Sequence, residues 1–254
     1  MQILRAGEGV RSREAKGAQW FISIDPLAEV RPWESPYCAM ANNPINAIDT
    51  DGRLVVFING MHSGSGGTAK YWNGFDNAAM KHLNDYNAVY RDGSVGGASN
   101  FHYNRSANYR RSQGYGQGLF DAPGILSRIV DANGNIKETI KIITHSMGAA
   151  YAKGYVRALL NYLKEMGIST DIIEFEADFA PYQPTEQKAN KEVKTYQFSH
   201  SKDKVAGNKK MEGAENMDTS DDKKQDHGIS TFMNQINNLP EGKYKIVDGK
   251  IVPY

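Results

Sequence analysis

Residues 139–166 read TIKIITHSMGAAYAKGYVRALLNYLKEM, and two different hydrophobic patterns meet there at one serine. Residues 139–145 are an apolar run rich in β-branched side chains, which is typical of a buried parallel strand. Residues 147–166 instead carry their apolar side chains at helical spacing, and Gly167 follows as a helix-ending residue. Ser146 is therefore expected on the turn between a strand and a helix.

The chain on both sides of this stretch repeats the alternation. Strands are predicted at 54–59, 87–91, 171–179 and 193–198, helices at 69–83, 120–130 and 229–239, and a hairpin at 244–252. Residues 92–118 are rich in glycine and aromatic residues without a period, and we expect either a lid over a site or an insertion without a role. Residues 202–226 are dominated by charged side chains and are expected to form a solvated loop. The alternation predicts an α/β fold with a mostly parallel sheet and helices on both faces.

Composition narrows the class of protein. The 254 residues are 40% hydrophobic and 23% charged with a formal net charge of +1, so no global field favours nucleic acid as a partner. The single cysteine, Cys38, excludes an internal disulfide and a multi-cysteine zinc site. No apolar run approaches the roughly 18 residues that span a bilayer, and residues 1–17 lack the apolar centre of a signal peptide. We expect no membrane-spanning segment or signal peptide in this chain, and at most transient membrane contact.

The run Thr144-His145-Ser146-Met147-Gly148 has the form of a nucleophile elbow. In such an elbow the serine lies on a strained strand-to-helix turn, and small residues two positions away keep their Cβ atoms from colliding. Gly148 meets this requirement, whereas Thr144 stands where a glycine is usual. A serine that only caps the following helix is the structural alternative.

Acyl transfer also needs backbone N–H groups that stabilise negative charge on the substrate carbonyl oxygen. Losing one such donor typically costs about 3 kcal/mol. One donor is expected from Met147, directly after the serine, and the other from Met61 in Asn59-Gly60-Met61, at the end of the first strand. These two amides are the predicted oxyanion hole.

The same loop has a competing interpretation. Residues 64–69 read GSGGTA and fit the dinucleotide-binding pattern G-x-G-x-x-A between a strand and a helix. That interpretation leaves the turn at Ser146 unexplained, and no lysine of a phosphate-binding P-loop follows. We therefore favour the hydrolase interpretation and expect no cofactor.

A serine nucleophile needs a base and an orienting acid, in the chain order Ser, acid, His. Only His200 and His227 follow Ser146, and we choose His227 because it lies in a loop rather than at a strand end. Asp203 follows a late strand and is the predicted acid, with Asp178 as its substitute. The remaining histidines show no metal-binding spacing and are expected to be structural or surface residues: His62, His82, His102 and His145.

Residues 21–52 closely resemble the end of the RHS-repeat-associated core domain. The matching motifs are Asp25-Pro26-Leu27, Ser35-Pro36-Tyr37, Asn42-Asn43-Pro44-Ile45-Asn46 and Asp49-x-Asp51-Gly52. In that family the segment after the closing motif is a variable effector, often a toxin used against competing bacteria. The resemblance implies an extended, turn-rich segment over 1–52, an effector domain over 53–254, delivery by an RHS-type system and a possible immunity protein as partner.

Residues 53–254 resemble lipase-like α/β-hydrolases through Asn59-Gly60-Met61 and Thr144-His145-Ser146-Met147-Gly148, and more loosely through Asp203-Lys204-Val205 and His227-Gly228. This resemblance implies an α/β-hydrolase fold and a lipid or other acyl ester as substrate. Two alternatives remain. One is a metal-dependent nuclease toxin that uses His200, Asp203, Asp226 and His227, and the other is an inactive cassette that only binds an immunity protein.

Overall fold

The computed structural model describes residues 54–95, 105–130, 135–206, 209–217, 227–240, 244–247 and 250–253. Within these residues a six-stranded sheet has the order β2-β1-β3-β4-β5-β6, and every neighbouring pair in it is parallel. Its strands are β1 (Leu54–Asn59), β2 (Asn87–Asp92), β3 (Ile140–His145), β4 (Ile173–Phe179), β5 (Lys194–Phe198) and β6 (Glu215–Met217). The predicted parallel sheet is confirmed.

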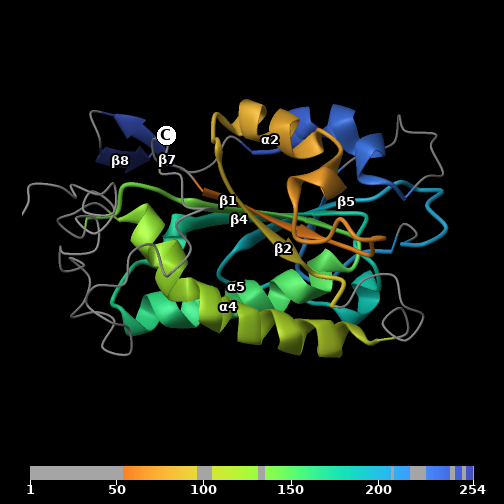
Figure 1. Cartoon of the computed structure of the whole chain (residues 1–254), viewed down its shortest axis with the longest axis horizontal. Coiled ribbons are helices and arrows are strands. Elements are labelled where there is room, and N and C mark those ends of the chain that lie inside the picture. Colours follow the sequence, from red (N-terminus) through yellow and green to blue (C-terminus); the bar gives the residue numbers. More distant parts are fainter. Residues whose placement is uncertain are drawn as a thin grey trace, which may run out of the picture.

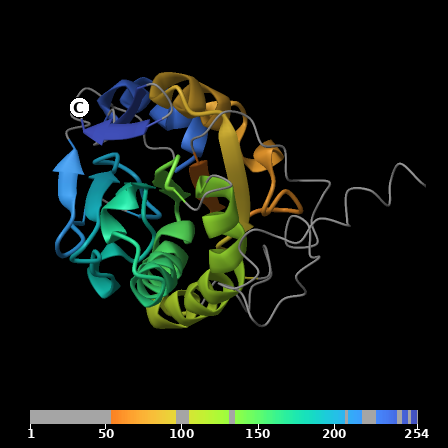
Figure 2. The same cartoon turned by 90° about the vertical axis from the view of Figure 1, so that its left-hand side faces the viewer.

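Helices cover both faces of the sheet (Figures 1 and 2). One face is covered by α4 (Ala107–Ile129) and α5 (Gly148–Glu165). The other is covered by α2 (Phe75–Leu83) and the 3-10 segments η4 (Ala69–Trp72) and η7 (Ile229–Asn238). Two short 3-10 turns, η5 (Thr170–Ile172) and η6 (Pro184–Glu186), flank β4. The strands β7 (Tyr244–Val247) and β8 (Lys250–Pro253) pair antiparallel, as expected for the predicted hairpin.

The two faces of the sheet bury different side chains. Successive residues of a strand point to opposite faces, so Val56 of β1 joins the cluster under α4 and α5 while Phe57 joins the cluster under α2 and η7. The first cluster is mainly aliphatic. The second is rich in aromatic rings, in which Phe179 stacks on Phe198 at 4.5 Å between centroids.

Helices α4 and α5 touch through glycines. A Cβ at Gly114 would lie 2.0 Å from the carbonyl oxygen of Tyr151, and one at Gly118 would lie 2.7 Å from that of Tyr155. Only backbone without side chains fits at these separations. Because Gly114 meets Tyr151 and Gly118 meets Tyr155, the helices run in the same direction, and both begin at the edge of the sheet where the strands end.

Three predictions of local structure are corrected. Residues 107–118, predicted as loop, form the first half of α4, so this part of the proposed lid is a helix packed on α5. A short strand, β6, lies inside the charged segment predicted to be wholly loop. The helix predicted at 69–83 is interrupted at Asn73 and Gly74, whose φ angles of 50° and 87° end η4 before α2 begins.

A buried polar cluster lies between β4 and α5. The ammonium of Lys153 is 2.8 Å from Glu176 Oε1 and 2.5 Å from Asp178 Oδ2, and Thr144 donates a hydrogen bond of 2.6 Å to Asp178 Oδ1. Burial raises the pKa of Glu176 to about 8, the Lys153 charge opposes this rise, and the nearby Asp178 adds to it. One carboxyl group of the cluster is therefore protonated near neutral pH.

The predicted RHS-core segment, residues 1–52, lies outside the described residues, as do residues 96–104 of the predicted lid and residues 218–226 of the charged loop. Within the described part of the chain, no helix is both long and apolar enough to cross a membrane.

Candidate active site

The predicted site residues meet where the strand order reverses. Strand β2 lies on one side of β1, and the strands from β3 onward lie on the other. In open α/β sheets, ligands bind beyond the carboxyl ends of the strands at such a point. Gly60 follows β1 and Ser146 follows β3, so the elbow and the loop after the first strand lie side by side there.

Ser146 lies in the strained conformation expected of a nucleophile elbow. Its φ angle is 57°, in the left-handed region that side chains other than glycine seldom occupy. The turn is held by a hydrogen bond of 2.9 Å from the Ser146 amide to the Phe179 carbonyl and one of 3.1 Å from the Tyr182 amide to the Ser146 carbonyl. Such strain persists only where surrounding contacts fix it.

Two glycines make this turn possible. A Cβ at Gly148 would lie 2.2 Å from the carbonyl oxygen of Ile58, and one at Gly60 would lie 2.5 Å from the Cβ of Ser146. The glycine that is usual two residues before the serine is replaced by Thr144. Its side chain fits because it lies on the α5 face of the sheet and bonds to Asp178.

His227 and Asp203 join Ser146 in one hydrogen-bonded row. His227 Nε2 is 2.8 Å from Ser146 Oγ, and His227 Nδ1 is 2.7 Å from Asp203 Oδ2. A carboxylate only accepts hydrogen bonds, so Nδ1 carries the proton and Nε2 is left to accept the proton of the serine hydroxyl. Three residues that the sequence placed at the site thus occupy the geometry of a nucleophile, a base and an orienting acid.

Asp203 is held as a carboxylate by its surroundings. Its Oδ1 accepts hydrogen bonds of 2.7 Å from the Val205 amide and 3.1 Å from the Ala206 amide. Burial alone would raise the pKa of Asp203, but the hydrogen bond and charge of His227, together with the two amides, hold that pKa below its usual value. Asp178, the substitute candidate, bonds instead to Thr144 and Lys153 in the buried cluster.

The predicted oxyanion donors, Met61 and Met147, flank the serine. Met147 lies between Ser146 and the first residue of α5, and Met61 follows Gly60, which packs directly against the serine side chain. Among the described residues, neither the Met61 nor the Met147 amide has a recorded hydrogen-bond acceptor. Within the described part of the chain, nothing therefore competes with a ligand beside Ser146 for these two donors.

The loop after β1 is braced from within. Asn59 donates to Asp92 Oδ1 at 3.1 Å and accepts from the Gly67 amide at 2.7 Å. His62 Nδ1 accepts from the Gly64 amide at 3.0 Å, and its Nε2 donates to Asp92 Oδ2 at 2.9 Å. Two amides of the GSGGTA stretch, those of Gly64 and Gly67, are thus already bonded within the loop, which argues against the dinucleotide interpretation.

Two residues of the site had no specific role in the sequence interpretation. His145, expected to be structural, has its Nδ1 hydrogen-bonded to the Tyr71 hydroxyl and its Nε2 2.7 Å from the carbonyl oxygen of His227. Tyr71 also accepts a hydrogen bond of 3.2 Å from the Gly60 amide. No spacing in the sequence marks Tyr71, although the histidine next to a proposed nucleophile could have drawn attention.

The residues of the nuclease hypothesis are placed differently from a metal centre. His200 is buried, lies 2.8 Å from Thr231 Oγ1 and stacks on Phe232 at 3.9 Å, while Asp203 and His227 bond to each other. Asp226 lies outside the described residues. In the described ranges, no group of three or more His, Cys, Asp or Glu side chains could hold a metal ion.

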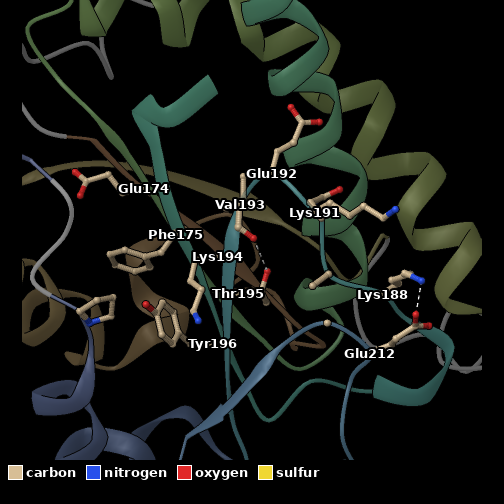
Figure 3. Close-up of a pocket in the computed structure, with 14 residues that line it drawn as sticks. Glu174, Phe175, Lys188, Lys191, Glu192, Val193, Lys194, Thr195, Tyr196 and Glu212 are labelled. Carbon is tan, nitrogen blue, oxygen red and sulfur yellow. Dashed lines mark hydrogen bonds and ion pairs between the residues drawn. The ribbon is translucent and has the colours of Figure 1, made fainter. Parts of the chain in front are cut away.

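A cavity of about 840 Å³ lies away from this site, at the amino ends of β4 and β5 (Figure 3). It is lined by positively charged lysine and negatively charged glutamate side chains, among them the ion pair of Lys188 with Glu212. Ser146, His227 and Asp203 do not line it.

Comparison with known proteins adds no relative: the chain matches no protein-family model, and a search of curated proteins finds no significant match. What the site can do chemically therefore rests on its own geometry. A hydroxyl bonded to an imidazole that can take its proton, with two backbone amides beside it, forms a set suited to attack on an acyl carbon.

Proposed function

We propose that the chain is a serine-dependent carboxylic-ester hydrolase of the lipase or phospholipase type. The observation that carries this proposal is the row Ser146 Oγ, His227 Nε2, His227 Nδ1 and Asp203 Oδ2, with separations of 2.8 and 2.7 Å. Ser146 is in addition held in the left-handed turn that such enzymes use.

In the proposed reaction the Ser146 oxygen attacks the acyl carbon and His227 Nε2 takes the hydroxyl proton. Asp203 stabilises the imidazolium that forms, because its carboxylate remains ionised beside Nδ1. The Met61 and Met147 amides donate to the oxygen that becomes negative. His227 then gives the proton to the leaving alcohol, and water activated by the same base releases the acid and restores the serine. The reaction as written requires no metal.

The biological setting that we propose follows from the resemblance of residues 21–52 to the RHS core. The hydrolase would be the effector of an RHS-type polymorphic toxin, delivered with that system, with a membrane lipid or another acyl ester as substrate. A cognate immunity protein would be its partner.

The test is labelling with a fluorophosphonate followed by peptide mapping, together with hydrolysis of a short-chain ester. We expect label on Ser146, and we expect Ser146→Ala to lower turnover by at least about 10⁴-fold while the thermal unfolding temperature changes little. The matched control is Ser127→Ala, because the Ser127 hydroxyl donates only to the carbonyl of Gly124 in α4. EDTA should leave the wild-type rate of ester hydrolysis unchanged, whereas it would abolish the activity of a metal-dependent nuclease. Undiminished hydrolysis by Ser146→Ala would refute the assignment.

A further inference from the structure

We propose that Tyr71 and His145 are positioning residues that tie the loop after β1, which carries the oxyanion donor Met61, to the backbone of the catalytic base, His227. This inference rests on the proposed hydrolase function. Neither residue belongs to the row of Ser146, His227 and Asp203. Their proposed role is to fix the distance between His227 and the amide donors.

The hydrogen bonds form a continuous chain across the site. The Gly60 amide lies 3.2 Å from the Tyr71 hydroxyl, that hydroxyl bonds to His145 Nδ1, and His145 Nε2 lies 2.7 Å from the carbonyl oxygen of His227. The rings follow one another as well, with 5.7 Å between the centroids of Tyr71 and His145 and 5.1 Å between those of His145 and His227.

For a neutral His145 imidazole, the two ends of this row of hydrogen bonds leave one arrangement of protons. The Gly60 amide can only donate and the His227 carbonyl can only accept. Tyr71 therefore accepts from Gly60 and donates to His145 Nδ1, which leaves the His145 proton on Nε2 for the carbonyl of His227. Burial raises the pKa of the Tyr71 phenol well above its usual value, so its proton is retained over the whole physiological range.

Each end of this row of hydrogen bonds holds one part of the proposed active site. Gly60 packs against the Ser146 side chain and precedes the oxyanion donor Met61, while the carbonyl of His227 belongs to the base itself. His145 is also the residue before Ser146, so the turn at Ser146 is anchored to the middle of this row of hydrogen bonds. Loss of a single hydroxyl should let the loop and the base move relative to each other, and misplacement of about 1 Å can cost up to about 100-fold in rate.

The experiment uses Tyr71→Phe, which removes the hydroxyl and keeps the ring that packs edge-on against Trp72. The matched control is Tyr90→Phe, because the Tyr90 hydroxyl is also partly buried and donates to one carboxylate, Asp76 Oδ2, at 2.7 Å. Measured quantities are kcat and KM for a short-chain ester, the rate of fluorophosphonate labelling and the thermal unfolding temperature. We expect Tyr71→Phe to lower kcat and the labelling rate by about 10- to 100-fold with KM nearly unchanged, and Tyr90→Phe to keep both rates.

A second variant tests whether the two residues act as one unit. His145→Asn is too short to keep the bond to the His227 carbonyl and should lower kcat in the same range. Because both changes break one chain, the double variant with Tyr71→Phe should be no slower than the slower single variant. Multiplying losses in the double variant, equal losses in the Tyr90→Phe control, or a wild-type kcat in Tyr71→Phe would each overturn the proposal.

A readout without turnover separates this proposal from the function on which it rests. The ¹⁵N spectrum of histidine-labelled wild-type protein should show His145 as the neutral imidazole with its proton on Nε2, and Tyr71→Phe should shift the Nδ1 resonance. A proton on Nδ1 in the wild type would refute the hydrogen-bonded chain even in an active enzyme. Wild-type protein that is never labelled at Ser146, but has the expected spectrum, would instead refute the hydrolase and the positioning role with it.

Discussion

Two polar networks are built on neighbouring strands of the same sheet, and they differ in what they can do. Beyond the ends of β3 and β5, Asp203 bonds to His227 and His227 to Ser146. Within the sheet, Asp178 and Glu176 of β4 bond to Lys153 of α5. Both networks contain a buried aspartate, and in both a pKa is shifted.

The difference lies in where each network ends. The first network reaches the Ser146 hydroxyl on a strained turn, and the side chain of His227 in it is 20% exposed. The second neutralises its own charges, with side-chain exposures of 2% for Lys153 and 0% for Glu176 and Asp178. Buried ionisable groups with shifted pKa values therefore do not by themselves mark a catalytic site, because an internal ion pair produces the same features.

The largest expected effect separates the two aspartates. Asp203→Asn should lower turnover by about 10⁴-fold with modest loss of stability, because the amide no longer orients and stabilises the His227 imidazolium. Asp178→Asn should instead lower the unfolding temperature, since Lys153 loses a charged partner, while folded molecules keep their turnover. Ester hydrolysis per folded molecule and thermal unfolding of both variants measure the contrast. The reverse assignment of losses would make Asp178 the acid.

The next effect concerns stability. Lys153→Met leaves two buried carboxyl groups without their cation, and we expect a loss of about 3–5 kcal/mol in the free energy of unfolding. The matched control is Lys188→Met, whose ion pair with Glu212 has side chains more than half exposed and should be worth at most about 1 kcal/mol. Urea unfolding followed by circular dichroism measures both variants. Equal losses would show that the internal cluster is no more important than a surface pair.

The smallest effect is a change in pH dependence. The pKa of Glu176 is raised to about 8 from an ordinary value near 4.5, so between these pH values the folded chain binds a proton that the unfolded chain lacks. Stability must then fall as pH rises through this window. Glu176→Gln imitates the protonated acid and should remove this slope, worth on the order of 1–3 kcal/mol between pH 5 and pH 8.

The control for this slope is Glu192→Gln, because Glu192 forms an exposed pair with Lys164. It should leave the pH profile of the unfolding temperature unchanged. A Glu176→Gln variant whose profile coincides with that of the wild type would contradict the shifted pKa.

The sequence predicted the parts of the structure whose pattern is local. The strand 139–145, the helix after it and the turn between them are encoded in one continuous run, and β3, Ser146 and α5 follow it to within a residue at each end. Chain order and position relative to the predicted strands select His227 and Asp203, and the structure brings both to Ser146. Their catalytic role stays a prediction until it is tested.

The parts that sequence reasoning missed depend on contacts between distant segments. The first half of α4 contains Gly114, Gly116 and Gly118, which weaken an isolated helix by roughly 1 kcal/mol each. Close packing of Gly114 and Gly118 on α5 stabilises the helix, and no local pattern shows that packing. Tyr71 was missed for a similar reason, since its partner His145 lies 74 residues away along the chain.

Gly60 also limits how the chain can be altered by selection or in the laboratory. Even alanine at this position would place its methyl carbon 2.5 Å from the Cβ of Ser146, so every replacement would displace the reactive turn. The next residue, Met61, is 43% exposed. Under the proposed function, substitutions at position 61 can therefore change ester preference without displacing the turn at Ser146, while position 60 stays glycine.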